Sequence, residues 1–194
     1  MNTEGKQPPR RRPLLTARQV AMIAAFGGLG FTWRALGLVI PLVPPFVLDI
    51  RETIIAIAAF AGGPYVAIAT GILIGLPSAV PMCDIVYYPL VGILIASVAK
   101  FVYRNRKKWW AWVLMFIVVA VAEALGLVVF VAILAYVLRL VSFWPELVAT
   151  FGITYWAYVL QEFIPLLILV QIASDFMKPT WSWRGGEEIE EITG

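Results

Sequence analysis

Long apolar runs, separated by short polar stretches, dominate the sequence. They fall at about residues 16–36, 50–62, 64–80, 84–103, 109–139 and 146–176. The first, fourth, fifth and sixth runs are long enough to cross a bilayer as α-helices, which takes about 20 residues. The pattern therefore predicts an all-α, polytopic membrane protein.

The second and third runs form one apolar stretch that is interrupted at Gly62, Gly63 and Pro64. On hydropathy alone, this stretch fits either one kinked helix or two short helices of about 13–17 residues. Two such helices are short for a bilayer of about 30 Å, so they would be tilted or shielded by neighbouring helices.

The distribution of Lys and Arg favours two short helices. Twelve of the 15 basic residues fall before the first run, after the fourth, or after the last. These three clusters share one side of the membrane if the interrupted stretch crosses twice. Because cytoplasmic loops carry the excess of Lys and Arg, we predict a six-transmembrane-helix bundle with both termini cytoplasmic. The clusters comprise Lys6, Arg10, Arg11, Arg12, Arg18, Lys100, Arg104, Arg106, Lys107, Lys108, Lys178 and Arg184.

The predicted domain organisation has three parts. Residues 1–13 form a basic cytoplasmic tail, residues 14–176 the six-helix transmembrane domain, and residues 177–194 an acidic cytoplasmic tail. The N-terminal stretch is rich in proline and lacks an A-x-A-like cleavage site before the Gly-rich helix. We therefore expect a retained tail and not a signal peptide.

Composition supports a membrane protein and argues against several functions. Hydrophobic residues make up 61% of the chain and charged residues 14%, against roughly a quarter charged in soluble proteins. The chain has no histidine, which removes His-based acid–base catalysis and His metal sites. Its one cysteine, Cys83, cannot form an internal disulfide, and no G-x-x-x-x-G-K-[ST] motif provides a P-loop. We expect no enzyme, no cofactor, no metal site and no nucleic-acid partner.

Three charged residues, Asp49, Arg51 and Glu52, lie at the start of the second apolar run. A buried charge is costly unless it is paired, hydrated or functional. The predicted topology places these residues at the outer mouth of the second helix, where the acids also complement the helix dipole. Two alternatives remain for Arg51: a solvated surface cluster with its acidic neighbours, or an anion-binding group in a dry pocket.

Two carboxyl residues, Glu123 and Glu162, fall well inside the apolar runs. Glu123 lies about 21 Å along its helix from Trp109, and Glu162 about 24 Å from Glu146. An intramembrane carboxyl is a candidate functional group. The alternative is a protonated glutamic acid that hydrogen-bonds to a neighbouring helix.

Small residues at four-residue spacing mark the first helix at Ala17, Ala21 and Ala25. Such a stripe allows close approach of two helices. It serves either packing within the bundle or docking of another protein. Because the stripe begins beside the basic N-terminal cluster, we predict a partner-docking surface.

The chain resembles the substrate-binding S component of an energy-coupling factor (ECF) transporter. The similar features are the six short-to-long spans, the Ala-x-x-x-Ala pattern and the segment PLVPPFVLDIRETIIAIAAFAGGPYVAIATGILIG. This segment is similar to the family's long first outer loop, second helix, Gly-Pro cytoplasmic turn and Gly-rich third helix. The resemblance covers about residues 14–176. Riboflavin-type members have an Asp-x-Ser-Asp-x-Pro pattern at the second-helix mouth, whereas this chain reads DIRETI, which argues against riboflavin.

The resemblance implies a multi-pass protein of a prokaryotic cell membrane that captures a vitamin or related micronutrient from outside. The expected partners are a transmembrane coupling protein and two cytoplasmic ATPases, which would supply the ATP hydrolysis of the ABC importer. Ligand residues differ between members and cannot be transferred by motif. From position we predict a pocket rimmed by Arg34, Arg51, Glu52 and Asp84, with Tyr87, Glu123, Tyr155 and Trp156 along its wall.

Two other functions compete with this one. The first is a stand-alone secondary transporter or channel that uses Glu123 and Glu162 as a proton relay. The second is a membrane enzyme such as an intramembrane protease. The missing histidine and the lack of a Gly-x-Ser-x-Gly motif or a metal-ligand cluster argue against the enzyme.

Overall fold

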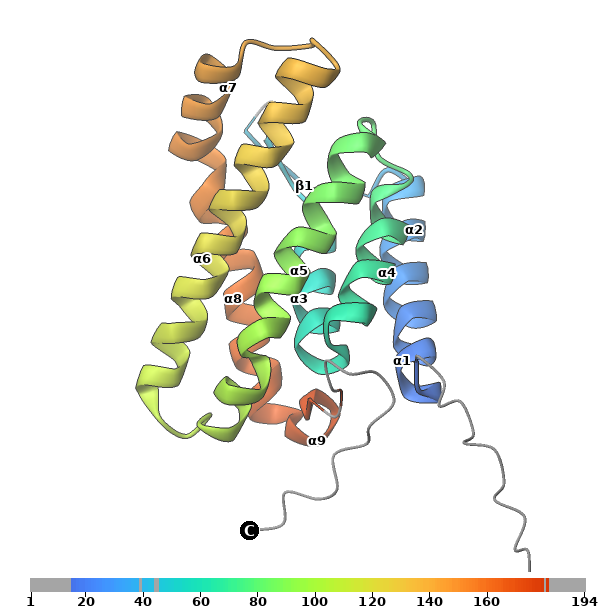
Figure 1. Ribbon diagram of the computed structural model, residues 1–194, viewed down its shortest axis with the longest axis vertical. Helices are drawn as coiled ribbons and strands as arrows, with labels where there is room; N and C mark the ends of the chain where they lie inside the picture. The colour runs from blue at the N-terminus through green and yellow to red at the C-terminus, as the bar shows by residue number, and fades with distance from the viewer. Residues whose placement is uncertain (1–14, 39, 44–45, 180, 182–194) are drawn as a thin grey trace, which may run out of the picture.

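The computed structural model describes residues 15–38, 40–43, 46–179 and 181. These residues form a bundle of helices with one short β-hairpin, so the predicted helical fold class is confirmed. In Figure 1, α1 (Ala17–Met22) and α2 (Gly28–Ala35) form one edge of the bundle. The opposite edge holds α6 (Trp109–Ala132), α7 (Phe143–Ala149) and α8 (Tyr155–Ile172).

The first apolar run forms one continuous helical segment, because a π-helical turn, η1 (Ile23–Gly27), joins α1 to α2. Thr16 begins it with a capping box: its hydroxyl accepts from Gln19 N, and the Gln19 side chain accepts from Thr16 N. After α2 the chain turns at Gly37, whose φ is +68°. It continues into the antiparallel strands β1 (Ile40–Val43) and β2 (Phe46–Leu48), which the hydropathy pattern did not predict.

The interrupted apolar stretch forms two helices, α3 (Ile50–Gly62) and α4 (Pro64–Gly75). Gly63 separates them with a φ of +85°, a conformation that favours glycine. Pro64 begins α4, where its missing N–H costs no helical hydrogen bond. The choice between one kinked helix and two short helices is therefore settled in favour of two.

Three helices are long and apolar enough to cross a membrane, considering the described residues alone. The first is α5 (Pro81–Arg104). The second is α6 with the π-turn η2 (Ile133–Val137), and the third is α8. A further π-turn, η3 (Thr150–Thr154), connects α7 to α8, and α9 (Ser174–Met177) follows. These lengths are compatible with membrane insertion, while α3 and α4, with 13 and 12 residues, are shorter than the about 20 residues of a typical span.

The core forms around α3, where every residue from Ile54 to Gly62 is buried. Helix α4 packs closely on α5 because its small residues share one face. A Cβ at Gly71 would lie 2.7 Å from Pro89 N, and one at Gly75 would lie 2.8 Å from Ile85 N. Helix α3 is short, and the neighbouring helices cover it.

One end of the bundle collects the start of α1, the α3–α4 turn, the α5–α6 turn and α9 (Figure 1). Arg18 Nη2 donates to Phe176 O (2.6 Å), Gln19 Nε2 to Gly62 O (3.2 Å), and Tyr103 OH to Ser174 O (3.0 Å). We call this the basic end, because its described cations include Arg18, Arg104, Arg106, Lys107, Lys108 and Lys178.

The two predicted tails fall largely outside the described part of the chain. Residues 1–13 lie wholly outside it, as do residue 180 and residues 182–194. Within the described part, Met177 and Trp181 are buried, and Trp181 Nε1 donates to Phe60 O (3.4 Å). The folded bundle therefore extends past residue 176.

Candidate functional site

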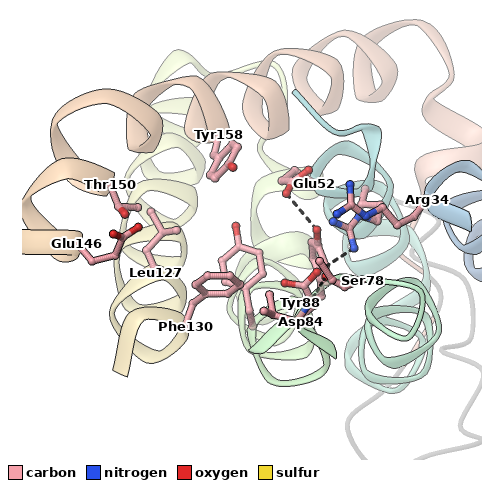
Figure 2. A pocket seen from close by; sticks show the side chains of 14 residues that line it. Arg34, Glu52, Ser78, Asp84, Tyr88, Leu127, Phe130, Glu146, Thr150 and Tyr158 are labelled. Carbon is pink, nitrogen blue, oxygen red and sulfur yellow. Dashed lines mark hydrogen bonds and ion pairs between the residues drawn. The ribbon is translucent and has the colours of Figure 1, made fainter. Parts of the chain in front are cut away.

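A cavity of about 270 Å³ is lined by residues of α2, α3, α5, α6, α7, η3 and α8 and of the α4–α5 turn (Figure 2). Its lining includes the end of α2, the starts of α3 and α5, and α7, which lie away from the basic end. Its lining consists of charged, hydroxyl and aromatic side chains and a few aliphatic ones. Its lining residues are Arg34, Arg51, Glu52, Ser78, Ala79, Val80, Asp84, Tyr87, Tyr88, Leu127, Phe130, Glu146, Thr150 and Tyr158.

Arg51 is the most extensively bonded side chain of the cavity. Its Nε donates to Asp49 Oδ2 over 2.7 Å, and its Nη1 donates to Asp84 Oδ2 over 2.9 Å and to Ile74 O over 3.1 Å. The side chain is only 5% exposed. The interpretation of Asp49, Arg51 and Glu52 as a solvated surface cluster is therefore wrong: Arg51 is buried and paired, as a desolvated cation requires.

Asp49 holds Arg51 through local geometry as well. It is the N-cap of α3, and its Oδ1 accepts from Arg51 N over 3.2 Å. Its backbone carbonyl accepts from Gln161 Nε2 on α8. The start of α3 is thus fixed to α5 through Asp84 and to α8 through Gln161.

Glu52 lies beside this network and faces the cavity (Figure 2). Tyr88 OH donates to Glu52 Oε1 over 3.1 Å, and the Arg51 guanidinium lies 5.0 Å from the centre of the Tyr88 ring. Glu52 Oε2 is buried and has no hydrogen-bond partner among the described residues. One acceptor position of this carboxyl group is therefore unused.

Arg34, from the last turn of α2, is the second cation at the cavity. Its side chain is 22% exposed, and its Nη1 lies 3.9 Å from Asp49 Oδ2. This distance gives an ion pair without a short hydrogen bond. Arg34 is consequently held less tightly than Arg51.

A second layer of polar groups lies behind the cavity wall. Tyr87 OH donates to Glu123 Oε2 over 2.7 Å, while Glu123 Oε1 and both carboxyl oxygens of Glu162 have no partner among the described residues. Both glutamates are fully buried, on the packed helices α6 and α8. Neither lines the cavity, so the predicted wall position of Glu123 is taken by Tyr87 in front of it.

Tyr155 and Trp156 also lie outside the cavity wall, in contrast to the sequence prediction. Tyr155 OH donates to Ala120 O on α6 over 2.8 Å, and Trp156 is 55% exposed. Trp156 and Tyr158 are two positions apart on α8 and so point in directions about 200° apart, which places Trp156 away from the cavity. Tyr155 lies on the same side of α8 as Tyr158, but its hydroxyl is bonded to α6, and Tyr158, one turn further along, lines the cavity instead.

The structure therefore brings together Arg34, Arg51, Glu52, Asp84 and Tyr87 from the predicted site. Sequence reasoning left out Tyr88 and Tyr158, although both share a helical face with a carboxyl residue, Asp84 and Glu162 respectively. It also left out Phe130 and Thr150. Both lie in apolar runs, and nothing in the local sequence distinguishes them from their neighbours.

Ala17, Ala21 and Ala25, the predicted docking residues, are exposed on the outer edge of the bundle, on α1 and η1 (Figure 1). Ala24 and Gly28 are exposed beside them. The stripe begins at the basic end, away from the cavity. These three alanines therefore lie at the surface of the described bundle.

No family model, curated protein or solved structure matches the chain. An account of its function therefore depends on the chemistry of the cavity and of the helix faces. The groups that face the cavity are hydrogen-bond donors, acceptors and aromatic rings on several helices, a combination typical of a small-molecule binding site.

Proposed function

We propose that this protein is the membrane-embedded substrate-capture subunit of an ECF-type ABC importer. It binds a vitamin or related micronutrient from outside the cell and delivers it with a transmembrane coupling protein and two cytoplasmic ATPases. The observation that carries the proposal is the position of the cavity. It lies at the end of the bundle opposite the basic end, where a ligand from outside would enter.

The proposed topology has six spans and cytoplasmic termini in a prokaryotic cell membrane. The basic end faces the cytoplasm, in agreement with the positive-inside rule. Helices α3 and α4 have 13 and 12 residues and so extend about 20 Å each. Their shortness is compatible with this arrangement because α3 is buried among its neighbours and has little contact with lipid.

The exposed face formed by Ala17, Ala21 and Ala25 supports a partner at the cytoplasmic side. Small side chains permit close backbone contact between transmembrane helices. A coupling protein that docks there would be well separated from the cavity. The ATPase site belongs to the partners in this proposal, so the chain itself is not an enzyme.

A second candidate is a stand-alone secondary transporter with Glu123 and Glu162 as a proton relay. The fully buried, incompletely bonded carboxyl groups of these residues favour it. It differs from the first proposal in needing no coupling protein. It also predicts that uptake depends on the two glutamates more than on the alanine face.

Two measurements test the proposed function. Mass spectrometry of small molecules that copurify with the detergent-extracted protein would identify the substrate. Uptake of that compound is then measured in cells with and without ECF coupling proteins. Uptake that requires the coupling module supports the capture subunit, and undiminished uptake without it supports the secondary transporter.

A further inference from the structure

Among the described residues that line the cavity, Glu52 has a buried carboxyl oxygen without a hydrogen-bond partner. The residue is 4% exposed, its Oε1 accepts from Tyr88 OH, and its Oε2 has no partner among the described residues. A buried carboxyl oxygen without a partner is unfavourable, and native proteins satisfy almost all such atoms. Because Glu52 lines the cavity, a ligand can supply the missing donor.

The charges around the cavity point to a donor that is cationic. Both guanidinium groups already face carboxylates: Arg51 bonds to Asp49 and Asp84, and Arg34 lies 3.9 Å from Asp49. Glu52 and Glu146 also line the cavity, and neither forms an ion pair within the described part of the chain. Carboxyl groups therefore outnumber guanidinium groups along the cavity. A ligand cation next to Glu52 would favour the ionised form of that carboxyl group, which burial disfavours, whereas an anion would not.

Aromatic rings close the same space from two sides. Tyr87, Tyr88, Phe130 and Tyr158 all line the cavity, and the Tyr87 and Phe130 rings meet edge to face at 6.1 Å. Figure 2 shows Tyr158 on the same side as Glu52 and Phe130 across from them, while a dashed line joins Tyr88 to Glu52. Ring faces attract both flat aromatic groups and cations.

We propose that the ligand is a small aromatic or heteroaromatic compound that carries a protonated nitrogen group, such as an amine or amidine. Glu52 Oε2 accepts a hydrogen bond from this nitrogen, and the tyrosine and phenylalanine rings contact the ring of the ligand. Arg51 is then an internal structural cation and does not bind an anionic ligand. The inference rests on the proposed function in one respect, namely that the cavity is the capture site.

Three probes of nearly the same shape test which ligand charge the cavity prefers: benzamidine, benzamide and benzoate. At neutral pH they are a cation, a neutral amide and an anion. Binding to the purified full-length protein is measured by calorimetry or by ligand-observed NMR up to millimolar concentrations. We expect benzamidine to bind at least about tenfold more tightly than benzoate, as for a charge-assisted hydrogen bond. Undetectable benzamidine binding, or tighter binding of benzoate, overturns the proposal.

Two variants assign the preference to Glu52. Glu52→Gln keeps the shape and an oxygen for the Tyr88 hydroxyl but removes the charge, so the preference for benzamidine falls about tenfold. Asp175→Asn removes an exposed carboxyl of α9 at the basic end, away from the cavity, so the preference persists. An unchanged preference in Glu52→Gln overturns the role of Glu52. The comparison among probes in the unmodified protein decides the ligand class even if Glu52→Gln does not fold.

The proposed ligand class and the proposed ECF function can fail independently, and different measurements detect each failure. If benzoate binds best and Arg34→Gln abolishes its binding, the ligand is anionic, and the importer assignment still depends on the uptake measurement. If benzamidine binds best but uptake of the copurified compound needs no coupling protein, the ligand class stands and the ECF assignment fails.

Discussion

Arg51 Nη1 donates to Asp84 Oδ2 over 2.9 Å and so joins the first turn of α3 to the first turn of α5, 33 positions further along the chain. Asp49 closes the network from the other side. All three side chains are buried. The network therefore holds the cavity-lining ends of two helices in place, and this role is compatible with binding without requiring that Arg51 touch a ligand.

Arg51→Ala is expected to destabilise the folded protein by about 3–5 kcal/mol, since it leaves the buried carboxylate of Asp84 without a cation and that of Asp49 with only the more distant Arg34. Thermal unfolding of the detergent-purified protein measures the loss. Lys107→Ala is the matched control, because Lys107 is an exposed cation at the other end of the bundle and its removal should change stability by less than about 0.5 kcal/mol.

The double variant Arg51→Met/Asp84→Leu distinguishes pairing from simple loss of side-chain volume. Replacing both partners with apolar groups removes the unpaired charge and should recover part of the stability. Equal stability of Arg51→Ala and the unmodified protein would show that the buried network contributes nothing to the fold.

The hydrogen bond from Tyr87 OH to Glu123 Oε2 should couple α5 to α6. Tyr87→Phe leaves a fully buried carboxyl with one partner fewer, and we expect a loss of about 1–3 kcal/mol. A double-mutant cycle with Glu123→Gln measures the interaction free energy between Tyr87 and Glu123. Tyr155→Phe is the control, because its hydroxyl bonds a backbone carbonyl and the side chain is only half-buried. If the losses of unfolding free energy in Tyr87→Phe and Glu123→Gln simply add in the double variant, the two side chains are not coupled.

Gly63→Ala should destabilise the α3–α4 turn by about 1–3 kcal/mol, because φ is +85° and ψ is −172°, a region that only glycine adopts readily. A Cβ at this position would also overlap the Trp181 ring. Gly152→Ala is the control, since a Cβ there meets nothing within 4 Å. The midpoint temperatures of thermal unfolding are measured for Gly63→Ala and Gly152→Ala. Equal midpoints would mean that Trp181 and the turn adjust to the added Cβ without loss of stability.

The sequence predicts the helices well because long apolar runs leave the backbone few alternatives in a membrane. Gly63 and Pro64 also indicate the break between α3 and α4. The β1–β2 hairpin is not predicted, because pairing between two short apolar strands depends on register and not on local pattern.

The site is harder to predict, because helix rotation and long-range pairing are set by packing. Nothing in the local sequence indicates that Arg51 meets Asp84, or that α8 directs Tyr158 to the cavity and Trp156 outward. Arg34 and Glu52, which lie near helix ends, could be predicted as cavity residues from their charge and from the expected positions of the helix ends.

The six-span topology predicts that the α5–α6 turn is cytoplasmic. A single cysteine at Asn105, in a background without Cys83, should resist an impermeant thiol reagent added to intact cells. A cysteine at Leu140, which is exposed at the opposite end of the bundle, is the matched control and should react. Ready labelling at position 105 would exclude the six-span arrangement with cytoplasmic termini.

The exposed alanine face of α1 and η1 should bind the coupling protein. Replacing Ala17 and Ala21 with Trp puts large rings where a close helix contact requires small side chains. Ligand binding by the isolated protein should survive, because the cavity lies at the other end, while copurification of the coupling protein and ATP-dependent uptake should fall together.

Val113→Trp and Ile117→Trp, at exposed apolar positions of α6, are the controls for added bulk in contact with lipid and should leave uptake within about twofold. Persistent uptake in the Ala17 and Ala21 variant would rule out docking at this face. Loss of ligand binding in the same variant would instead indicate that the alanines support the fold of the bundle, since a docking surface on the opposite end has no reason to affect capture.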